Sequence, residues 1–213
     1  MYIEIDNIVK KFNNDYVIKD ISLKINKGDI VGIVGRNGSG KTVLLKIIAG
    51  LYIPTSGSVK INNLMLGKDI EFPQKTGILI DTDFLPDKTG LENLTLLADL
   101  CKDININRCY DAMKLVSLDP FSKTKYKNYS QGMKQKLKIA QVLLNNNELL
   151  ILDEPFNTLD KESVINIRKI LLDLNKENNT TIIITSHVEE DIKLLCNKVY
   201  EMDKGVIYEK KKI

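Results

Sequence analysis

The stretch 35–42 has residue types and a spacing suited to holding phosphate groups. It reads Gly-Arg-Asn-Gly-Ser-Gly-Lys-Thr and matches the pattern G-x-x-x-x-G-K-[ST]. Glycines let the backbone curl so that several N–H groups converge on one phosphate at the positive end of a helix. Lys41 is then predicted to bridge the β- and γ-phosphates of a nucleotide, and the Thr42 hydroxyl to bind Mg²⁺. By itself the loop is equally compatible with kinases, GTPases and motor ATPases. The candidate phosphate-binding residues are Gly35, Asn37, Gly38, Ser39, Gly40, Lys41 and Thr42.

Two acidic residues, Asp153 and Glu154, close a predicted strand of four apolar residues at 149–152. Ligands gather at the carboxyl edge of an open parallel sheet. Asp153 is placed there to hold Mg²⁺ through water. Glu154 can reach a water in line with the γ-phosphate and act as general base. The alternative for Glu154 is an acid at a helix N-terminus, favoured by the helix dipole.

His187 is the only histidine of the chain and follows an apolar stretch at 181–185. A lone histidine is more often a surface or packing residue than a catalytic one. This stretch, however, is expected to lie beside the strand that ends at Asp153. The imidazole would then reach the same sheet edge, hydrogen-bond the γ-phosphate and orient the water.

Ser130-Gln131-Gly132 is a second element that could contact phosphate, because a serine hydroxyl and backbone N–H groups at a helix N-terminus donate to anions. It lies on a predicted helical segment that ends shortly before the acidic strand. A chain with both this element and the loop at 35–42 has more phosphate contacts than one site needs. We therefore expect a site that a second polypeptide completes.

The elements that must position these residues alternate along the chain. Hydrophobic periodicity and turn signals predict an antiparallel β region near the N-terminus, an all-helical middle and a final part in which apolar strands alternate with helices. Such alternation indicates a parallel sheet covered on both faces, with the helical stretch as an insertion. The predicted strands are 3–9, 17–25, 30–34, 59–61, 77–80, 149–152 and 181–185, with a hairpin turn at 203–205. The predicted helices are 42–51, those within 90–146 including 131–144, 161–176 and 188–195.

Composition limits the function classes. At 213 residues the chain is expected to be one domain, and its net charge of +3 comes from lysines spread among nearly as many acids. This balance argues against a nucleic-acid partner. No apolar run reaches the ~18–20 residues needed to cross a bilayer, so a membrane role would depend on a partner subunit. Met1–Ile5 lacks the form of a secretion signal, and an odd number of cysteines without CxxC spacing indicates a reducing compartment.

Taken together, these features resemble the nucleotide-binding subunit of an ABC transporter over essentially the whole chain. Residues 129–133, Tyr-Ser-Gln-Gly-Met, correspond to the family's signature sequence, and residues 157–160, Asn-Thr-Leu-Asp, to its D-loop. The resemblance implies that two subunits meet head to tail around ATP and Mg²⁺. Ser130 and Gly132 of one would face the γ-phosphate held by Lys41 of the other. It also places the adenine-stacking aromatic at Phe12, against the alternative of a core aromatic at a strand end, and adds Val17, Val43 and Asp160 to the nucleotide-binding residues.

The sequence departs from the family pattern at a few positions. Gln131 and Met133 replace Gly and Gln of the usual signature, whereas the serine and second glycine remain. Asp81 stands where the family usually has the Q-loop glutamine. It can still bind Mg²⁺ or a water, and we count it among the candidate metal ligands with Thr42 and Asp153. Val43 lacks a hydroxyl that could contact the α-phosphate.

The chain is accordingly predicted to be one α/β domain with a P-loop NTPase core and a mainly parallel sheet. The catalytic core with an N-terminal antiparallel β subdomain would span 1–81 and 147–213, and an inserted helical subdomain about 82–146. We expect a Mg²⁺-dependent ATPase in which Lys41, Glu154 and His187 catalyse the hydrolysis of ATP. The subunit is expected to dimerise with another copy of itself or with a close paralogue. It would drive an integral membrane subunit docked near 82–128 while lying on the cytoplasmic face of the cell membrane.

With its departures from the family pattern, such as Asp81, the sequence resembles the ABC-2 branch of exporters, which includes transporters for bacitracin and for lantibiotic self-protection. A nucleic-acid or ribosome-associated ABC ATPase would need a coiled-coil insertion or a second cassette. A non-transporting ATPase that signals to a membrane sensor or enzyme stays open as the alternative.

Overall fold

The central element is a sheet with strand order β10-β9-β3-β8-β7-β6, seen in a computed structural model that describes residues 1–101 and 104–210. Its neighbouring strands run parallel, except that β10 pairs antiparallel with β9. This is the mainly parallel sheet predicted from the apolar strands, to which β9 and β10 are added by the hairpin at 203–205. The strands are β3 (Ile30–Val34), β6 (Thr76–Leu79), β7 (Leu149–Leu152), β8 (Thr181–Ser186), β9 (Lys198–Asp203) and β10 (Val206–Lys210).

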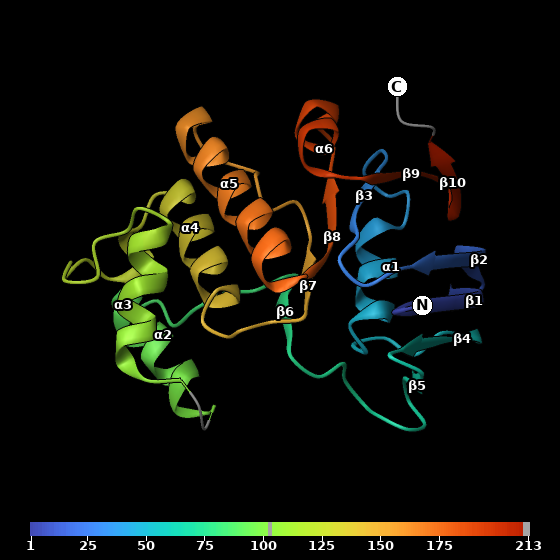
Figure 1. Cartoon of the computed structure of the whole chain (residues 1–213), viewed down its shortest axis with the longest axis horizontal. Coiled ribbons are helices and arrows are strands. Elements are labelled where there is room, and N and C mark those ends of the chain that lie inside the picture. Colours follow the sequence, from blue (N-terminus) through green and yellow to red (C-terminus); the bar gives the residue numbers. More distant parts are fainter. Residues whose placement is uncertain (102–103, 211–213) are drawn as a thin grey trace.

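A second, antiparallel sheet has the order β2-β1-β4-β5 and is built by the first third of the chain. In Figure 1 it lies on the far side of helix α1 (Lys41–Ile48) from the other helices. This confirms the predicted N-terminal β region, although β1 and β2 are longer than expected and the two-residue β5 was not predicted. The strands are β1 (Ile3–Phe12), β2 (Asp15–Ile25), β4 (Ser56–Ile61) and β5 (Leu64–Met65).

The inserted helices pack on one another at the opposite end of the molecule (Figure 1). All three α-helices begin at side-chain caps that the sequence encodes, and Asn105 provides the one for α3. Thr89 and Glu92 form a reciprocal capping box at the start of α2, and the Ser130 hydroxyl accepts from the Met133 amide at the start of α4. These helices fall within 82–146, which we propose as the helical subdomain. They are α2 (Gly90–Asp99), α3 (Ile106–Leu115), the 3₁₀ turn η1 (Tyr126–Asn128) and α4 (Gln131–Val142).

Two further helices, α5 (Lys161–Asn178) and α6 (Glu189–Leu195), follow β7 and β8 in the chain. Helix α5 is the longest helix of the described residues. None of the helices in the described part of the chain has the length and apolar character that crossing a bilayer demands.

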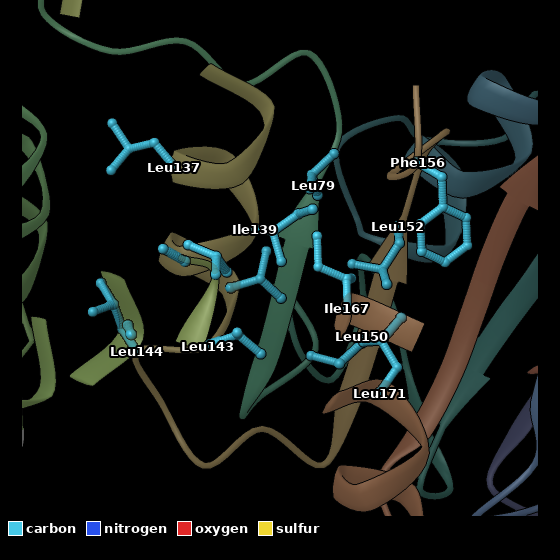
Figure 2. Packing of buried hydrophobic residues seen from close by; sticks show 14 of the residues in the cluster. Leu79, Leu137, Ile139, Leu143, Leu144, Leu150, Leu152, Phe156, Ile167 and Leu171 are labelled. Atoms are coloured by element: carbon cyan, nitrogen blue, oxygen red, sulfur yellow. The ribbon is translucent and has the colours of Figure 1, made fainter. Parts of the chain in front are cut away.

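The central strands of this sheet are buried on both faces, because alternate side chains of a strand such as β7 enter different hydrophobic clusters. Leu150 and Leu152 of β7 pack toward α4 and α5, as Figure 2 shows. Leu149 and Ile151 pack toward α1 and the antiparallel sheet. All four side chains are at most 2% exposed. Burial on both faces is the reason that this strand is apolar throughout rather than alternating.

Candidate active site

The carboxyl ends of three neighbouring strands, β3, β8 and β7, bring the predicted chemical groups to one edge of the sheet. Val34 at the end of β3 pairs with Ser186 of β8, and Leu152 at the end of β7 pairs with Ile184. The loop that follows β3 and the acids that follow β7 therefore lie on either side of the end of β8. The predicted meeting of the loop at 35–42, the acidic pair and the histidine is found in the structure.

The phosphate loop is folded tightly against the β9–β10 hairpin. A Cβ atom at Gly35 would lie 2.2 Å from the Met202 carbonyl oxygen, and Gly40 has a φ of 109°, so both positions favour glycine. Gly40 also leaves the start of α1 without a side-chain cap. The Ser39 hydroxyl is buried and without a partner among the described residues. Uncapped amides and an unpaired buried hydroxyl fit the binding of phosphate groups.

Lys41 is the buried cation of the site, with a side chain that is 5% exposed. Its Nζ donates to the Gly35 carbonyl oxygen at 2.7 Å and to that of Arg36 at 3.2 Å. It also lies 3.8 Å from Oε1 of Glu154. The ammonium group thus sits between the phosphate loop and the predicted general base.

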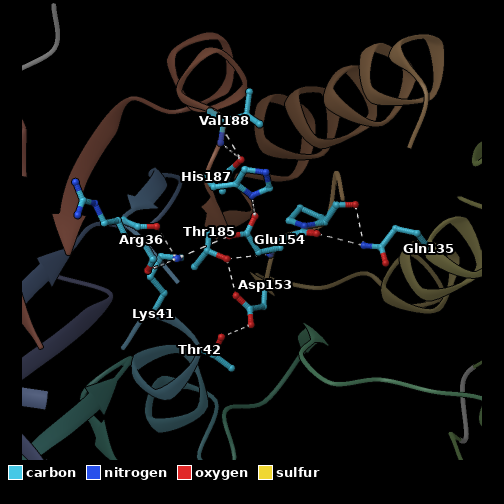
Figure 3. A network of polar contacts seen from close by, with 12 residues as sticks. Arg36, Lys41, Thr42, Gln135, Asp153, Glu154, Thr185, His187 and Val188 are labelled. Carbon is cyan, nitrogen blue, oxygen red and sulfur yellow. Dashed lines mark hydrogen bonds and ion pairs between the residues drawn. The ribbon is translucent and has the colours of Figure 1, made fainter. Parts of the chain in front are cut away.

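The Asp153 carboxylate is held by a hydroxyl on each side (Figure 3). Thr42 Oγ1 donates to Oδ2 and Thr185 Oγ1 donates to Oδ1, both at 2.6 Å. Such hydroxyl and carboxylate oxygens fit Mg²⁺, which is usually held by one or two carboxylates together with substrate phosphates. Among the described residues no group of three or more His, Cys, Asp or Glu side chains gathers as a protein cage for a metal.

Thr185 is a site residue that the sequence did not identify. Besides holding Asp153, its hydroxyl oxygen accepts from the Glu154 amide at 2.9 Å. It therefore fixes both acidic residues at once. The one available signal was a polar residue at the end of an otherwise apolar strand, two positions before the histidine.

Glu154 and His187, the predicted general base and the predicted γ-phosphate contact, lie next to each other. His187 Nδ1 lies 3.0 Å from Oε2 of Glu154, within hydrogen-bonding distance. The Glu154 side chain is 19% exposed and that of His187 is 57% exposed, so the pair lies between the buried lysine and solvent. Glu154 is not the first residue of a helix, and its φ of 48° is a left-handed conformation that is uncommon outside glycine.

Ser130 and Gly132 lie elsewhere, at the start of α4. Ser130 caps this helix, and a Cβ atom at Gly132 would lie 3.2 Å from the Thr158 carbonyl oxygen. Across the described part of the chain, no hydrogen bond or ion pair joins either residue to the phosphate loop. Within one chain, the two predicted phosphate-binding elements are therefore separate.

Asp160 and Asp81 have other partners in this structure. Asp160 caps α5, and hydrogen bonds from Ser163 hold the pKa of its carboxyl below the ordinary value. Asp81 is 70% exposed and forms an ion pair of 2.6 Å with Lys46 on α1. Its carboxylate makes no hydrogen bond to Thr42 or Asp153, so its role as a metal ligand stays a prediction.

The remaining predicted residues lie around the loop and the antiparallel sheet. Phe12 is 40% exposed and packs edge-to-face on Tyr52, with ring centroids 5.6 Å apart. Phe12 is therefore not a buried core aromatic, and its exposed ring is held in place by Tyr52. The Val17 carbonyl oxygen would be 3.0 Å from a Cβ at Gly40, so its backbone borders the phosphate loop. Val43 packs against the hydrophobic cluster between α1 and the sheets.

Comparisons with known proteins give a consistent result. The ABC transporter family profile matches residues 18–157. An uncharacterized ABC transporter ATP-binding protein of Bacillus subtilis (strain 168), YybJ, is 40% identical over 212 residues, covering 99% of this chain and 97% of the relative. The bacitracin transport ATP-binding protein BcrA of Enterococcus faecalis is 37% identical, covering 97% of this chain and 68% of its own length. A dimeric ATP-binding cassette, solved in a post-hydrolysis state with ADP and Pi, superposes with a TM-score of 0.88 at 27% identity, covering 99% of both chains.

Proposed function

Since the chain belongs to the ABC transporter family, as an ATP-binding subunit with an ABC-type ATPase domain, we propose that it pairs head to tail with a second such subunit around ATP and Mg²⁺. Closure of this dimer would drive a separate membrane subunit that exports its substrate. The second subunit is another copy of this chain or a close paralogue. The location that follows is the cytoplasmic face of the cell membrane, through the membrane subunit.

One observation carries the dimer proposal. Lys41, Glu154 and His187 meet at one sheet edge, whereas Ser130 and Gly132 lie at the start of α4, and no hydrogen bond or ion pair of the described residues joins them to that edge. The chain therefore has one half of each of two sites. A head-to-tail pair joins these halves, and the similarity to a dimeric cassette supports this arrangement.

The residues of the site suit hydrolysis of a terminal phosphate. Glu154 would take a proton from water as general base, with His187 orienting its carboxylate through the 3.0 Å contact. Lys41 would exchange its loop carbonyls and its contact with Glu154 for the β- and γ-phosphates, which would free Glu154 to act as a base. Thr42 and Asp153 would hold Mg²⁺, which neutralises charge on the phosphate oxygens. The products would be ADP and phosphate.

The proposal of export is supported by the acidic residue at position 81 and by two relatives named for bacitracin transport, which at 37% and 34% identity are more similar to this chain than two named for methionine import, at 33% and 31%. We propose the surface of 82–128 for docking of the membrane subunit. This surface has exposed leucines that a partner could cover: Leu85 is 53% exposed and Leu96 44% exposed. Exposed apolar side chains that gather on one region are typical of interaction surfaces.

The test uses the Glu154→Gln variant, which keeps the shape of the side chain and removes the base. With ATP and Mg²⁺ it is expected to bind nucleotide, lose turnover and accumulate as a dimer in light scattering. Pulled down from membranes in that state, it should bring a protein with several membrane spans that could form a translocation path. Lys41→Met, which should not bind ATP productively, is the control.

Normal ATP turnover by Glu154→Gln would contradict the assignment of the base. A co-purified sensor or enzyme with no plausible path would favour the signalling alternative over transport. Absence of any membrane protein from the ATP-bound sample, with a dimer present, would contradict coupling to a membrane subunit.

A further inference from the structure

Gln135 joins the helix that begins at Ser130 to the backbone of the predicted general base. It is half-buried on α4, and its Nε2 atom donates to the Pro155 carbonyl oxygen at 2.9 Å and lies 3.4 Å from that of Glu154. Figure 3 shows the side chain reaching from α4 toward these carbonyl groups. A side-chain amide has two N–H groups, so one Gln135 can serve both acceptors.

The backbone that Gln135 contacts is strained. A left-handed conformation at a residue other than glycine is unfavourable and persists only where its surroundings enforce it. Glu154 has this conformation, with a φ of 48°. Its amide donates to Thr185, and its carbonyl oxygen accepts from the Asn157 amide at 3.2 Å as well as from Gln135. The direction of the Glu154 side chain, and so its reach to His187, depends on these contacts.

The same helix contacts the other end of this segment near its own start. Gly132 lies so close to the Thr158 carbonyl oxygen that an added Cβ would be 3.2 Å away. Helix α4 therefore contacts both ends of the loop 154–158. Gly132, in the first turn of the helix, lies against Thr158, and Gln135, in the second turn, reaches the backbone at the start of the loop. A short helix is stiff, so a displacement of its Ser130 end would be passed to Gln135.

We propose that Gln135 is a positioning residue that couples the two nucleotide sites of the dimer. Contact of Ser130 and Gly132 with the nucleotide of the partner subunit would shift α4, and Gln135 would transmit that shift to the backbone of Glu154 in the chain's own site. The inference rests on the proposed function, because it needs a partner nucleotide at the start of α4. It adds a route by which one site senses that the other is filled.

The test compares Gln135→Met with Gln141→Met in the intact protein. Methionine is unbranched, suits a helix and has no N–H donor. Gln141 is on the same helix, and its Oε1 atom is buried without a hydrogen-bond partner among the described residues, so its replacement removes no hydrogen bond of that atom. Turnover is measured against ATP concentration, ATP affinity by titration at low protein concentration, and ATP-driven dimerisation in the Glu154→Gln background.

Gln135→Met is expected to keep ATP affinity and dimerisation and to lose about three- to tenfold in kcat, the size expected for loss of a neutral hydrogen bond to the backbone that holds Glu154. The Hill coefficient is expected to fall to 1, because the variant lacks the link between the two sites. Gln141→Met should match the wild type. An unchanged kcat and Hill coefficient in Gln135→Met, with a cooperative wild type, would overturn this inference alone. A wild type that neither dimerises with ATP nor shows cooperativity would overturn the proposed function as well.

If Gln135→Met does not fold, which a melting curve reveals, Gln135→Glu replaces it. This variant keeps the shape of the side chain and removes its donors, so the same loss of kcat and cooperativity is expected. Wild-type values of both in Gln135→Glu would overturn the inference.

Discussion

Replacing Thr185 by valine tests whether its hydroxyl fixes the two acidic residues of the site. Thr185 is fully buried and uses its hydroxyl twice, as donor to the Asp153 carboxylate at 2.6 Å and as acceptor from the Glu154 amide at 2.9 Å. Valine keeps the branched shape of the side chain and removes both hydrogen bonds. The variant therefore changes chemistry more than packing.

The size of the effect follows from these two bonds. A hydrogen bond to a charged group contributes about 1.5–3 kcal/mol, and a buried amide left without a partner costs about 1–3 kcal/mol. Burial of the additional methyl group of valine offsets about 0.8 kcal/mol of this loss. The free energy of unfolding should therefore fall by about 2–5 kcal/mol, equivalent to a drop of about 4–20 °C in Tm at this chain length. Because Asp153 is a predicted metal ligand, kcat should fall about 10–100-fold.

Urea unfolding of the nucleotide-free protein and steady-state ATP hydrolysis measure these effects, and Thr185→Ser is the matched control. Serine keeps the hydroxyl and loses one buried methyl group, so it should cost only about 0.5–1.5 kcal/mol and restore most of the activity. The reasoning would be refuted if the valine variant were as stable and active as wild type, or if serine were worse than valine.

Three further predictions concern the loop, the helical part and the aromatic residue at the antiparallel sheet. Gly38→Ala should cost only about 1–2 kcal/mol of backbone strain, since nothing lies within 4 Å of the added Cβ. Gly35→Ala should abolish binding of a fluorescent ATP analogue, because its Cβ would clash with the Met202 carbonyl oxygen. The Tyr126 hydroxyl donates to Asp83 at 2.6 Å and lowers the pKa of that carboxyl. This stabilisation is present above the ordinary pKa of an aspartate, about 4, and is lost as the pH falls through the lowered value. Tyr126→Phe should therefore destabilise the protein more at pH 7 than at pH 3 in urea unfolding, and equal losses at both would contradict the assignment. Phe12→Ala should weaken ATP binding about 5–100-fold, as expected for loss of a stacked base, and leave tripolyphosphate binding unchanged, which calorimetry can measure.

The sequence identified the groups whose role depends on local motif and strand end. Asp153 and His187 are found together because each directly follows a strand of the same parallel sheet, and Lys41 and Thr42 join them because the phosphate loop that leads into α1 follows the neighbouring strand β3. The role of Thr185 could not be predicted in this way. It depends on the register between β7 and β8, which sets the residue after Leu152 opposite the residue after Ile184.

Contacts between elements that are distant along the chain could also not be predicted from the sequence. Asp81 was predicted to be a metal ligand from its position in the sequence alone. Its ion pair with Lys46 depends on how closely α1 approaches the end of β6. The link from Gln135 to the backbone of Glu154 likewise follows from the packing of α4 on the loop 154–158. In the antiparallel sheet, β5 has only two residues and gives no periodic pattern to recognise.

The central claim is that each nucleotide site is built from two chains, and mixing two inactive variants tests it most directly. Lys41→Met loses the phosphate loop and keeps the element at Ser130. Gly132→Asp keeps the loop and sets a negative charge against the partner's phosphates, at a position in the first turn of α4 where an acid suits the helix dipole.

Each variant alone should be inactive. Their equal mixture should recover up to about a quarter of wild-type ATP hydrolysis, because about half of the dimers are mixed and each mixed head-to-tail dimer has one complete site. Activity of Gly132→Asp alone, or no recovery in a mixture proven to contain mixed dimers, would contradict the claim.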